Sequence, residues 1–331
     1  MALTVNVAFN KLLSETVNLD PMQTKKARAS RDWLFGQIAS FQNDSTFPKS
    51  YSEHDLHYGS FARRTKIRPL DDIDFMICLH AQGAYYTEYS DRIEITVQPE
   101  TNLKAFCNDY TNTLNSIRVI NKFIRKCAGV PQYSKSDLKR NGAAAVLSLQ
   151  SYDWSFDIVP CFITGEDIFR RSYYFIPDGN GNWKKTDPRI DRERAKEINR
   201  KHNGNVLNVI RIIKYWNKRP TMPSIGSYLL ETIILNYYET SVSTASEFVD
   251  LEIPKILDYI GTQIYSQIND PKNIQGNIND LSLDDKIKIA TRAKADKTKA
   301  DEARGLESIG DHKGSIQKWG EIFGSEFPTY G

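Results

Sequence analysis

The chain has 331 residues, of which 40% are hydrophobic and 26% are charged, and these proportions are ordinary for a soluble protein with two domains. Its net charge of +3 is too small to favour DNA or RNA as an obligate partner. No run is apolar over the length of a membrane span and the polar N-terminus lacks signal-peptide features, so we expect a cytoplasmic protein without membrane contact. The four cysteines lack Cys-x-x-Cys spacing, which predicts reduced core thiols rather than a zinc site.

The N-terminal segment is predicted to be helical. Apolar residues recur at helical spacing over residues 7–41. Asp20 is suited to cap a helix and Pro21 to occupy its first position, so a long helix should run from Pro21 to about Ser40. Periodicity alone is compatible with a surface helix on one domain.

A glycine-serine turn follows. Gly59 and Ser60 open a helical turn whose exposed backbone amides suit phosphate oxygens, although a Gly-Ser pair by itself marks any turn. The basic segment 63–68 is typical of solvated surface, and electrostatic support of a triphosphate is the alternative.

The next predicted strand has two faces of opposite character. Asp72 and Asp74 are two residues apart, so their carboxylates project from one face, while Ile73, Phe75 and Ile77 project from the other. Paired carboxylates at this spacing suit Mg²⁺, although an Asp-x-Asp pair by itself is more often structural. A phosphate turn followed by a metal-binding strand indicates nucleotide chemistry.

A predicted hairpin supplies a third carboxylate. Two short apolar runs, 144–149 and 154–159, favour paired strands, and the second contains Asp157. Burying this carboxylate without a partner would be costly. A metal ion shared with Asp72 and Asp74 would remove that cost.

The remaining elements predict an α+β fold. Residues 93–97 favour a strand and 102–126 an amphipathic helix; 162–186 are rich in turn residues and predict a loop. The charged segment 187–202 predicts a solvated helix. Further helices are predicted at 204–218, from Gly226 onward, at 247–269 and at 284–304. Strands before this region and helices after it predict two domains, 1–190 and 191–331.

The motifs together resemble a known family. The run HYGSFARRTKIRPLDDIDFMICL, which ends at Leu79, contains Gly-Ser-x-x-Arg-x-Thr followed by Asp-x-Asp, and WSFDIVPCF contains Asp157. This pattern resembles the polymerase β-like nucleotidyltransferases and, more narrowly, the bacterial cGAS/DncV-like nucleotidyltransferases (CD-NTases, SMODS type). The resemblance implies a bilobed protein: a nucleotidyltransferase core, with a mixed sheet flanked by helices, and a C-terminal helical domain. The active site would lie in the cleft, and the long N-terminal helix would brace both lobes.

Two later motifs extend the resemblance. Lys214 followed by Ser-Tyr-Leu-Leu-Glu at 227–231 resembles the family's donor site, which implies that Lys214 and Ser227 hold the donor triphosphate and that Tyr228 stacks on its base. Lys214 lies off the apolar stripe of its predicted helix, and without the resemblance Tyr228 would be assigned to the core. The closing pattern Trp-x-x-Ile-Phe-Gly-x-x-Phe-Pro resembles the end of many family members.

The resemblance implies a cyclic oligonucleotide synthase that uses nucleoside triphosphates as donor and acceptor. Asp72, Asp74 and Asp157 would bind two Mg²⁺ ions, with Mn²⁺ as an alternative. The cyclic di- or trinucleotide second messenger would act on a separate effector protein in anti-phage (CBASS) defence, and the enzyme would be a monomer. Two other interpretations stay open: another polymerase β-like enzyme that tails RNA or nucleotidylates protein, and a non-catalytic nucleotide-binding protein. Base choice, 2′ or 3′ linkage, ring size, the activating signal and conjugation through Gly331 are left open.

Overall fold

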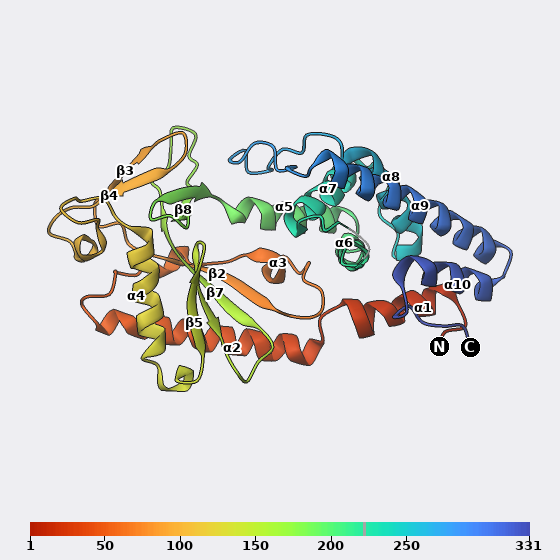
Figure 1. The fold of residues 1–331 in the computed structure, drawn as a ribbon, viewed down its shortest axis with the longest axis horizontal. Helices are drawn as coiled ribbons and strands as arrows, with labels where there is room; N and C mark the ends of the chain where they lie inside the picture. The colour runs from red at the N-terminus through yellow and green to blue at the C-terminus, as the bar shows by residue number, and fades with distance from the viewer. Residues whose placement is uncertain (221–222) are drawn as a thin grey trace. The chain divides into compact units, whose positions relative to one another are not determined.

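A mixed sheet and a set of helices form two units in the computed structural model, which describes residues 1–220 and 223–331 (Figure 1). Two segments form the sheet unit: Pro21–Ala62 and Pro69–Arg189. Three segments form the helical unit: Met1–Asp20, Arg63–Arg68 and Ile190–Gly331. Each unit is therefore assembled from segments that are far apart in the sequence.

The sheet unit contains nine strands among its described residues, with the main path β1-β2-β7-β8-β9-β4-β3. Beside that path, β6 pairs with β7 and with β5. Strands β2 and β7 run parallel, and the other strand pairs are antiparallel. The strands are β1 (Leu56–His57), β2 (Asp72–Cys78), β3 (Tyr85–Glu88), β4 (Ile93–Thr96), β5 (Asp137–Asn141), β6 (Ala144–Ser148), β7 (Ser155–Ile163), β8 (Tyr174–Pro177) and β9 (Trp183–Thr186).

The start of β2 has the predicted alternation. Its apolar residues are buried, whereas Asp72 and Asp74 on the opposite face are half-buried. Phe75 packs against Phe35 of α2 (Pro21–Ser40), with the ring centroids 4.6 Å apart. The predicted bounds of this helix are confirmed, and it contacts the face of β2 that lies opposite to the acids.

The predicted helix over 102–126 is wrong at its start. A 3₁₀ turn covers Asn102–Phe106, and α4 runs only from Ser116 to Ala128. The Asn115 side chain accepts hydrogen bonds at 3.0 and 3.3 Å from the backbone amides two and three residues later. This N-cap fixes where the helix begins and prevents the earlier apolar residues from joining it.

The segment predicted as a loop, 162–186, contains the hairpin of β8 and β9. Gly179 and Gly181 adopt φ values of +96° and +107° in its turn, where a side chain would be strained. The turn residues were therefore identified correctly. The strands beside them are too short to give a period of two that can be recognised in the sequence.

The helical unit is built on a single apolar core of aliphatic and aromatic side chains. Its helices are α1 (Val5–Leu12), most of α5 (Pro188–Lys201), α6 (Val206–Asn217), α7 (Ser227–Thr240), α8 (Val249–Gln263), α9 (Leu283–Ser308) and α10 (His312–Phe323). In the part of the chain that the structure describes, no helix combines the length and the apolar character needed to cross a membrane.

The C-terminal aromatic motif packs against the first helix. Three rings surround Phe9 at centroid distances of 4.9 to 5.7 Å: Trp319, Phe323 and Phe327. The amide of Ala2 donates a 2.9 Å hydrogen bond to the carbonyl of Thr329, so the two ends of the chain lie side by side (Figure 1). This packing explains the motif in structural terms, because its aromatic rings close the core of the helical unit.

Candidate active site

The register of β2 and β7 brings three carboxylates to one face of the sheet. Asp74 lies directly opposite Asp157 in the parallel pair, and Asp72 lies opposite Ser155. Residues that face each other in adjacent strands project to the same side, and so does a residue two positions earlier in a strand. Asp72, Asp74 and Asp157 therefore share one face, and all three are half-buried.

The negative charges of these carboxylates also affect the pKa of the Tyr58 phenol. Its pKa is raised well above the usual value, first by burial and then by the negative charges of Asp74, Asp157 and Asp72, with Cys161 also contributing. The amide of Tyr58 donates to the carbonyl of Asp74 at 3.3 Å, which places this residue beside the acidic strand. Sequence reasoning gave Tyr58 no role, because a tyrosine before a Gly-Ser turn carries no signal of its own.

Gly59 lies against this acidic face. Its φ is +73°, and a Cβ built at this position would lie 1.9 Å from Oδ2 of Asp74. Any side chain here would collide with the carboxylate, so the close approach requires glycine. The short helix α3 (Gly59–Ala62), with Ser60 as its second residue, therefore begins directly beside the acids.

The donor chemistry of the face fits a divalent cation, since Mg²⁺ prefers carboxylate oxygens. Three carboxylates share this face, those of Asp72, Asp74 and Asp157, and Gly59 approaches Asp74 closely. Among residues 1–220 and 223–331, no three His, Cys, Asp or Glu side chains are already gathered as a set of ligands around one ion.

The second predicted group, Lys214 with Ser227 and Tyr228, lies in the helical unit. Lys214 is 4% exposed, so it is buried although it is outside the apolar stripe predicted for its helix. Its Nζ lies 2.8 Å from Oε1 of Glu231 and donates to the carbonyl of Thr65 at 3.0 Å. A buried acid from the next helix makes burial of the lysine tolerable.

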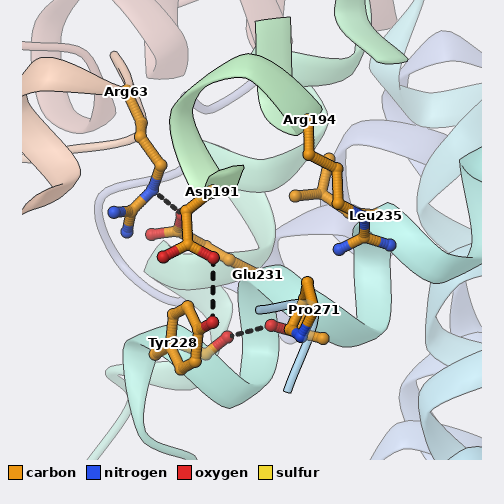
Figure 2. A pocket seen from close by; sticks show the side chains of 8 residues that line it. Arg63, Asp191, Arg194, Tyr228, Glu231, Leu235 and Pro271 are labelled. Atoms are coloured by element: carbon orange, nitrogen blue, oxygen red, sulfur yellow. Dashed lines mark hydrogen bonds and ion pairs between the residues drawn. The ribbon is translucent and has the colours of Figure 1, made fainter. Parts of the chain in front are cut away.

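Glu231 lies at the centre of a buried cluster of charged side chains. Its Oε2 accepts from Nε of Arg63 at 3.0 Å (Figure 2). Its Oε1 accepts from Oγ1 of Thr65 at 2.9 Å. Burial alone would raise the pKa of Glu231, but the charges of Arg63 and Lys214 outweigh burial and the pKa is lowered. Burial lowers the pKa of Lys214, and Glu231 offsets only part of that effect. The carboxylate is therefore held in its charged form.

Tyr228 is half-buried in the first turn of α7, next to the exposed Ser227. Its hydroxyl lies 2.8 Å from Oδ1 of Asp191 (Figure 2). It also lies 2.7 Å from Oδ1 of Asp270. The hollow beside this tyrosine measures only about 10 Å³, room for little more than one water-sized sphere. It is therefore not itself a nucleotide pocket.

Sequence reasoning missed most of these partners. Arg63 and Thr65 belong to the segment expected to be solvated, and Asp191 belongs to the helix predicted to be solvated, yet its side chain is only 11% exposed. Charges of mixed sign look the same in a sequence whether they face water or a distant partner. No local signal could have identified these contacts, because the partners are 37 to 168 residues apart.

Comparison with known proteins gives a clear result. No family model matches the chain. Over 333 residues it is 45% identical to a protein of Bacillus cereus (strain VD146) named a probable cyclic nucleotide synthase, with 100% of this chain and 99% of that one covered.

Solved structures share the fold. CdnC of Escherichia coli MS115-1 with ATP superimposes with a TM-score of 0.70 at 16% identity, over 97% of this chain and 98% of that one. The CdnC:HORMA-deltaN complex gives 0.69 at 16% identity, over 97% of each chain. The cyclic AMP-GMP synthase DncV of Vibrio cholerae gives 0.66 at 10% identity, also over 97% of each.

The predicted fold class is thereby confirmed: a mixed sheet flanked by helices, followed by a C-terminal helical region. The identity to the Bacillus relative extends over the whole length of both chains, far above the level at which only a fold is shared. The chain belongs to the bacterial cGAS/DncV-like nucleotidyltransferases, the CD-NTases.

Proposed function

We propose that this protein is a cyclic oligonucleotide synthase that joins nucleoside triphosphates into a cyclic di- or trinucleotide second messenger. The observation that carries the proposal is the register of β2 and β7, which sets Asp74 opposite Asp157 and puts Asp72 on the same face. The Bacillus relative is named a probable cyclic nucleotide synthase, which supports a cyclic product. The structures of CdnC with ATP and of the cyclic AMP-GMP synthase DncV support triphosphate substrates.

In the proposed mechanism, Asp72 and Asp74 would hold one metal ion, and Asp157 would join them in holding a second. Two Mg²⁺ ions, or Mn²⁺ in their place, would lower the pKa of the attacking ribose hydroxyl and neutralise charge on the phosphates. The backbone of Gly59 and Ser60, directly beside Asp74, orients the phosphate oxygens. The hydroxyl attacks the α-phosphate in line and pyrophosphate leaves.

We propose that the donor nucleotide is also bound by Lys214, Ser227 and Tyr228. The exposed Ser227 offers a hydroxyl at a helix start, and the half-buried Tyr228 offers an aromatic face for the base. Within the described residues, Lys214 uses two of its three N–H donors on Thr65 and Glu231. One donor is left for a phosphate oxygen, so its role in the proposal is a single directed hydrogen bond rather than a bare positive charge.

A second, intramolecular transfer would close the ring, and the product would act on a separate effector protein in CBASS anti-phage signalling. We propose a monomeric enzyme that works in the cytoplasm without obligate DNA or RNA, which the net charge of +3 supports. The structure of CdnC with HORMA-deltaN shows that this neighbour can assemble with a protein. An equivalent partner for this chain would be a regulator rather than a substrate.

The test is to incubate the purified protein with all four α-³²P-labelled nucleoside triphosphates and Mg²⁺, then to treat the product with phosphatase. We expect a labelled product that resists phosphatase, because a ring has no terminal phosphate. A labelled ladder on added RNA would indicate tailing, and label on protein would indicate nucleotidylation. Absence of pyrophosphate release under every condition would indicate a nucleotide-binding protein without catalysis and would contradict the proposal.

A further inference from the structure

Tyr228 is fixed at its hydroxyl end by groups from two other segments. The hydroxyl lies within 2.8 Å of a carboxylate oxygen of Asp191, from α5, and of Asp270, from the segment after α8. It also contacts Nζ of Lys272. Asp270 is itself held by backbone amides of its own turn, at 3.1 Å from Gln275 and 3.3 Å from Ile274. The tyrosine is therefore tied to an ordered turn rather than to mobile side chains.

Lys272 connects the members of this group. Its side chain is 4% exposed, and Nζ lies 2.9 Å from Oδ1 of Asp270 and 3.2 Å from Oδ2 of Asp191. The same Nζ lies 4.2 Å from the centroid of the Tyr228 ring. Because the same Nζ contacts the hydroxyl oxygen, the ammonium lies at the hydroxyl end of the ring rather than over its centre. Lys272 therefore holds the phenol oxygen and neutralises charge on the two acids.

Proton counting shows why the lysine is needed. The phenol has one proton, which can be donated to only one carboxylate at a time, although oxygens of Asp191 and Asp270 both lie within reach. Burial first, and then these two acids, raise the pKa of Tyr228, so the phenol stays neutral. Without the ammonium, two buried carboxylates would compete for a single proton.

We propose that Lys272 is a positioning residue of the donor-base site, which fixes the hydroxyl end of Tyr228 and so sets the angle of the ring face on which the nucleobase stacks. This inference rests on the proposed function, in which Tyr228 stacks on the donor base. Lys272 lies at the hydroxyl end, so it fixes the ring without occupying the face that a base would use. Base stacking is made in the ground state as well as in the transition state, so the effect of Lys272 falls on KM rather than kcat.

The test compares Lys272→Met with Lys313→Met, a matched change at an exposed lysine of α10, by measuring pyrophosphate release against nucleoside triphosphate concentration. We expect Lys272→Met to raise KM about fivefold with kcat within twofold, because a ring that is no longer held at its hydroxyl end must be ordered when the base binds. Lys313→Met should change neither parameter. Lys272→Arg keeps a cation that can contact the hydroxyl and the two acids, and it should restore most of the affinity.

A double-substitution cycle shows whether the lysine acts through the tyrosine. Tyr228→Leu should raise KM by about tenfold, and adding Lys272→Met to it should raise KM no further. If Tyr228→Leu leaves KM unchanged, the proposed stacking role fails. If Tyr228→Leu raises KM and Lys272→Met does not, or if the two effects multiply, only the positioning role of Lys272 fails.

Loss of folding is controlled separately by far-ultraviolet circular dichroism and thermal unfolding of each variant. If Lys272→Met does not fold, Tyr228→Phe carries the test, because it keeps the ring and removes only the hydroxyl contacts to Asp191 and Asp270. We expect Tyr228→Phe to raise KM two- to threefold at constant kcat. An unchanged KM in a folded Tyr228→Phe protein would overturn the inference.

Discussion

The two units of this protein use charge in opposite ways. In the sheet unit, β2 and β7 gather three carboxylates, Asp72, Asp74 and Asp157, on one half-buried face. In the helical unit, Glu231 is buried against two cations, Lys214 and Arg63, which satisfy it within the protein.

The difference separates charges that are placed for a ligand from charges that stabilise the fold. Carboxylates that crowd one face repel one another, a cost that a protein tolerates where a cation is to bind. Balanced pairs stabilise each other without any ligand. The comparison therefore predicts that substitutions of the three carboxylates on the sheet remove activity, whereas removal of the buried carboxylate of Glu231 lowers stability.

The largest expected effect is on catalysis. Asp74→Asn and Asp157→Asn should each lower product formation about a thousandfold or more, because an amide is a poor ligand for Mg²⁺. The unfolding free energy should stay the same or rise as repulsion is relieved. Initial rates of pyrophosphate release and urea denaturation measure the two quantities. The matched control is Asp153→Asn, at an exposed turn before β7. Equal activity of all three variants would show that Asp74 and Asp157 take no part in catalysis.

Gly59→Ala should reduce both activity and stability, because its Cβ would overlap Asp74 and its φ is +73°. We expect activity to fall about a hundredfold and the unfolding free energy to fall by about 1–3 kcal/mol. Gly36→Ala is the matched control: nothing lies within 4 Å of its Cβ, and alanine in a helix interior should stabilise by about 0.5–1 kcal/mol. A fully active Gly59→Ala enzyme would mean that the turn does not touch the acids.

Glu231→Gln should affect mainly stability. Removing the acid leaves Lys214 and Arg63 buried without their counter-charge, so the unfolding free energy should fall by about 3 kcal/mol. Glu197→Gln, at an exposed site on α5, should change it by less than about 0.5 kcal/mol. Urea denaturation at constant pH compares the two variants. Equal midpoints would show that the cluster around Glu231 contributes nothing to the fold.

The smallest expected effect is a pH dependence at the edge of the sheet. Burial raises the pKa of Asp55 from 3.8 to about 6, although the amide of Cys78 donates to its Oδ1 at 2.7 Å. The folded state then binds more protons than the unfolded state, so this contribution is present below pH 3.8 and is lost as the pH rises through 6. Asp55→Asn keeps an acceptor but does not titrate.

The difference in unfolding free energy between Asp55→Asn and the natural protein isolates this contribution from other carboxylates. Measured by urea denaturation between pH 4 and 7.5, the advantage of the asparagine variant should grow with pH and level off above about 7. A difference that does not vary with pH would show that the carboxyl is not desolvated.

The acidic strand could be predicted because its signal is local. Alternation fixes which residues of β2 share a face, and a hairpin pattern places Asp157 in a strand, so only the pairing of β2 with β7 was left to the structure. The bounds of α2 were equally local, since Asp20 and Pro21 mark its start.

The charged clusters of the helical unit could not be predicted in this way. Glu231 contacts Arg63 across 168 residues, and Tyr228 contacts Asp270 across 42. Whether such a side chain faces water or a partner depends on how distant segments pack, and periodicity contains no information about that. The family resemblance indicated Lys214 and Tyr228 but not the acids and the lysine that hold them in place.

The most direct measurement is anomalous diffraction from crystals of the protein grown with Mn²⁺ and a non-hydrolysable nucleoside triphosphate. We expect anomalous peaks bounded by the carboxylates of Asp72, Asp74 and Asp157, beside Gly59. Bound nucleotide with no peak at this face, or with its metal held elsewhere, would contradict the assignment of the β2–β7 face as the metal site.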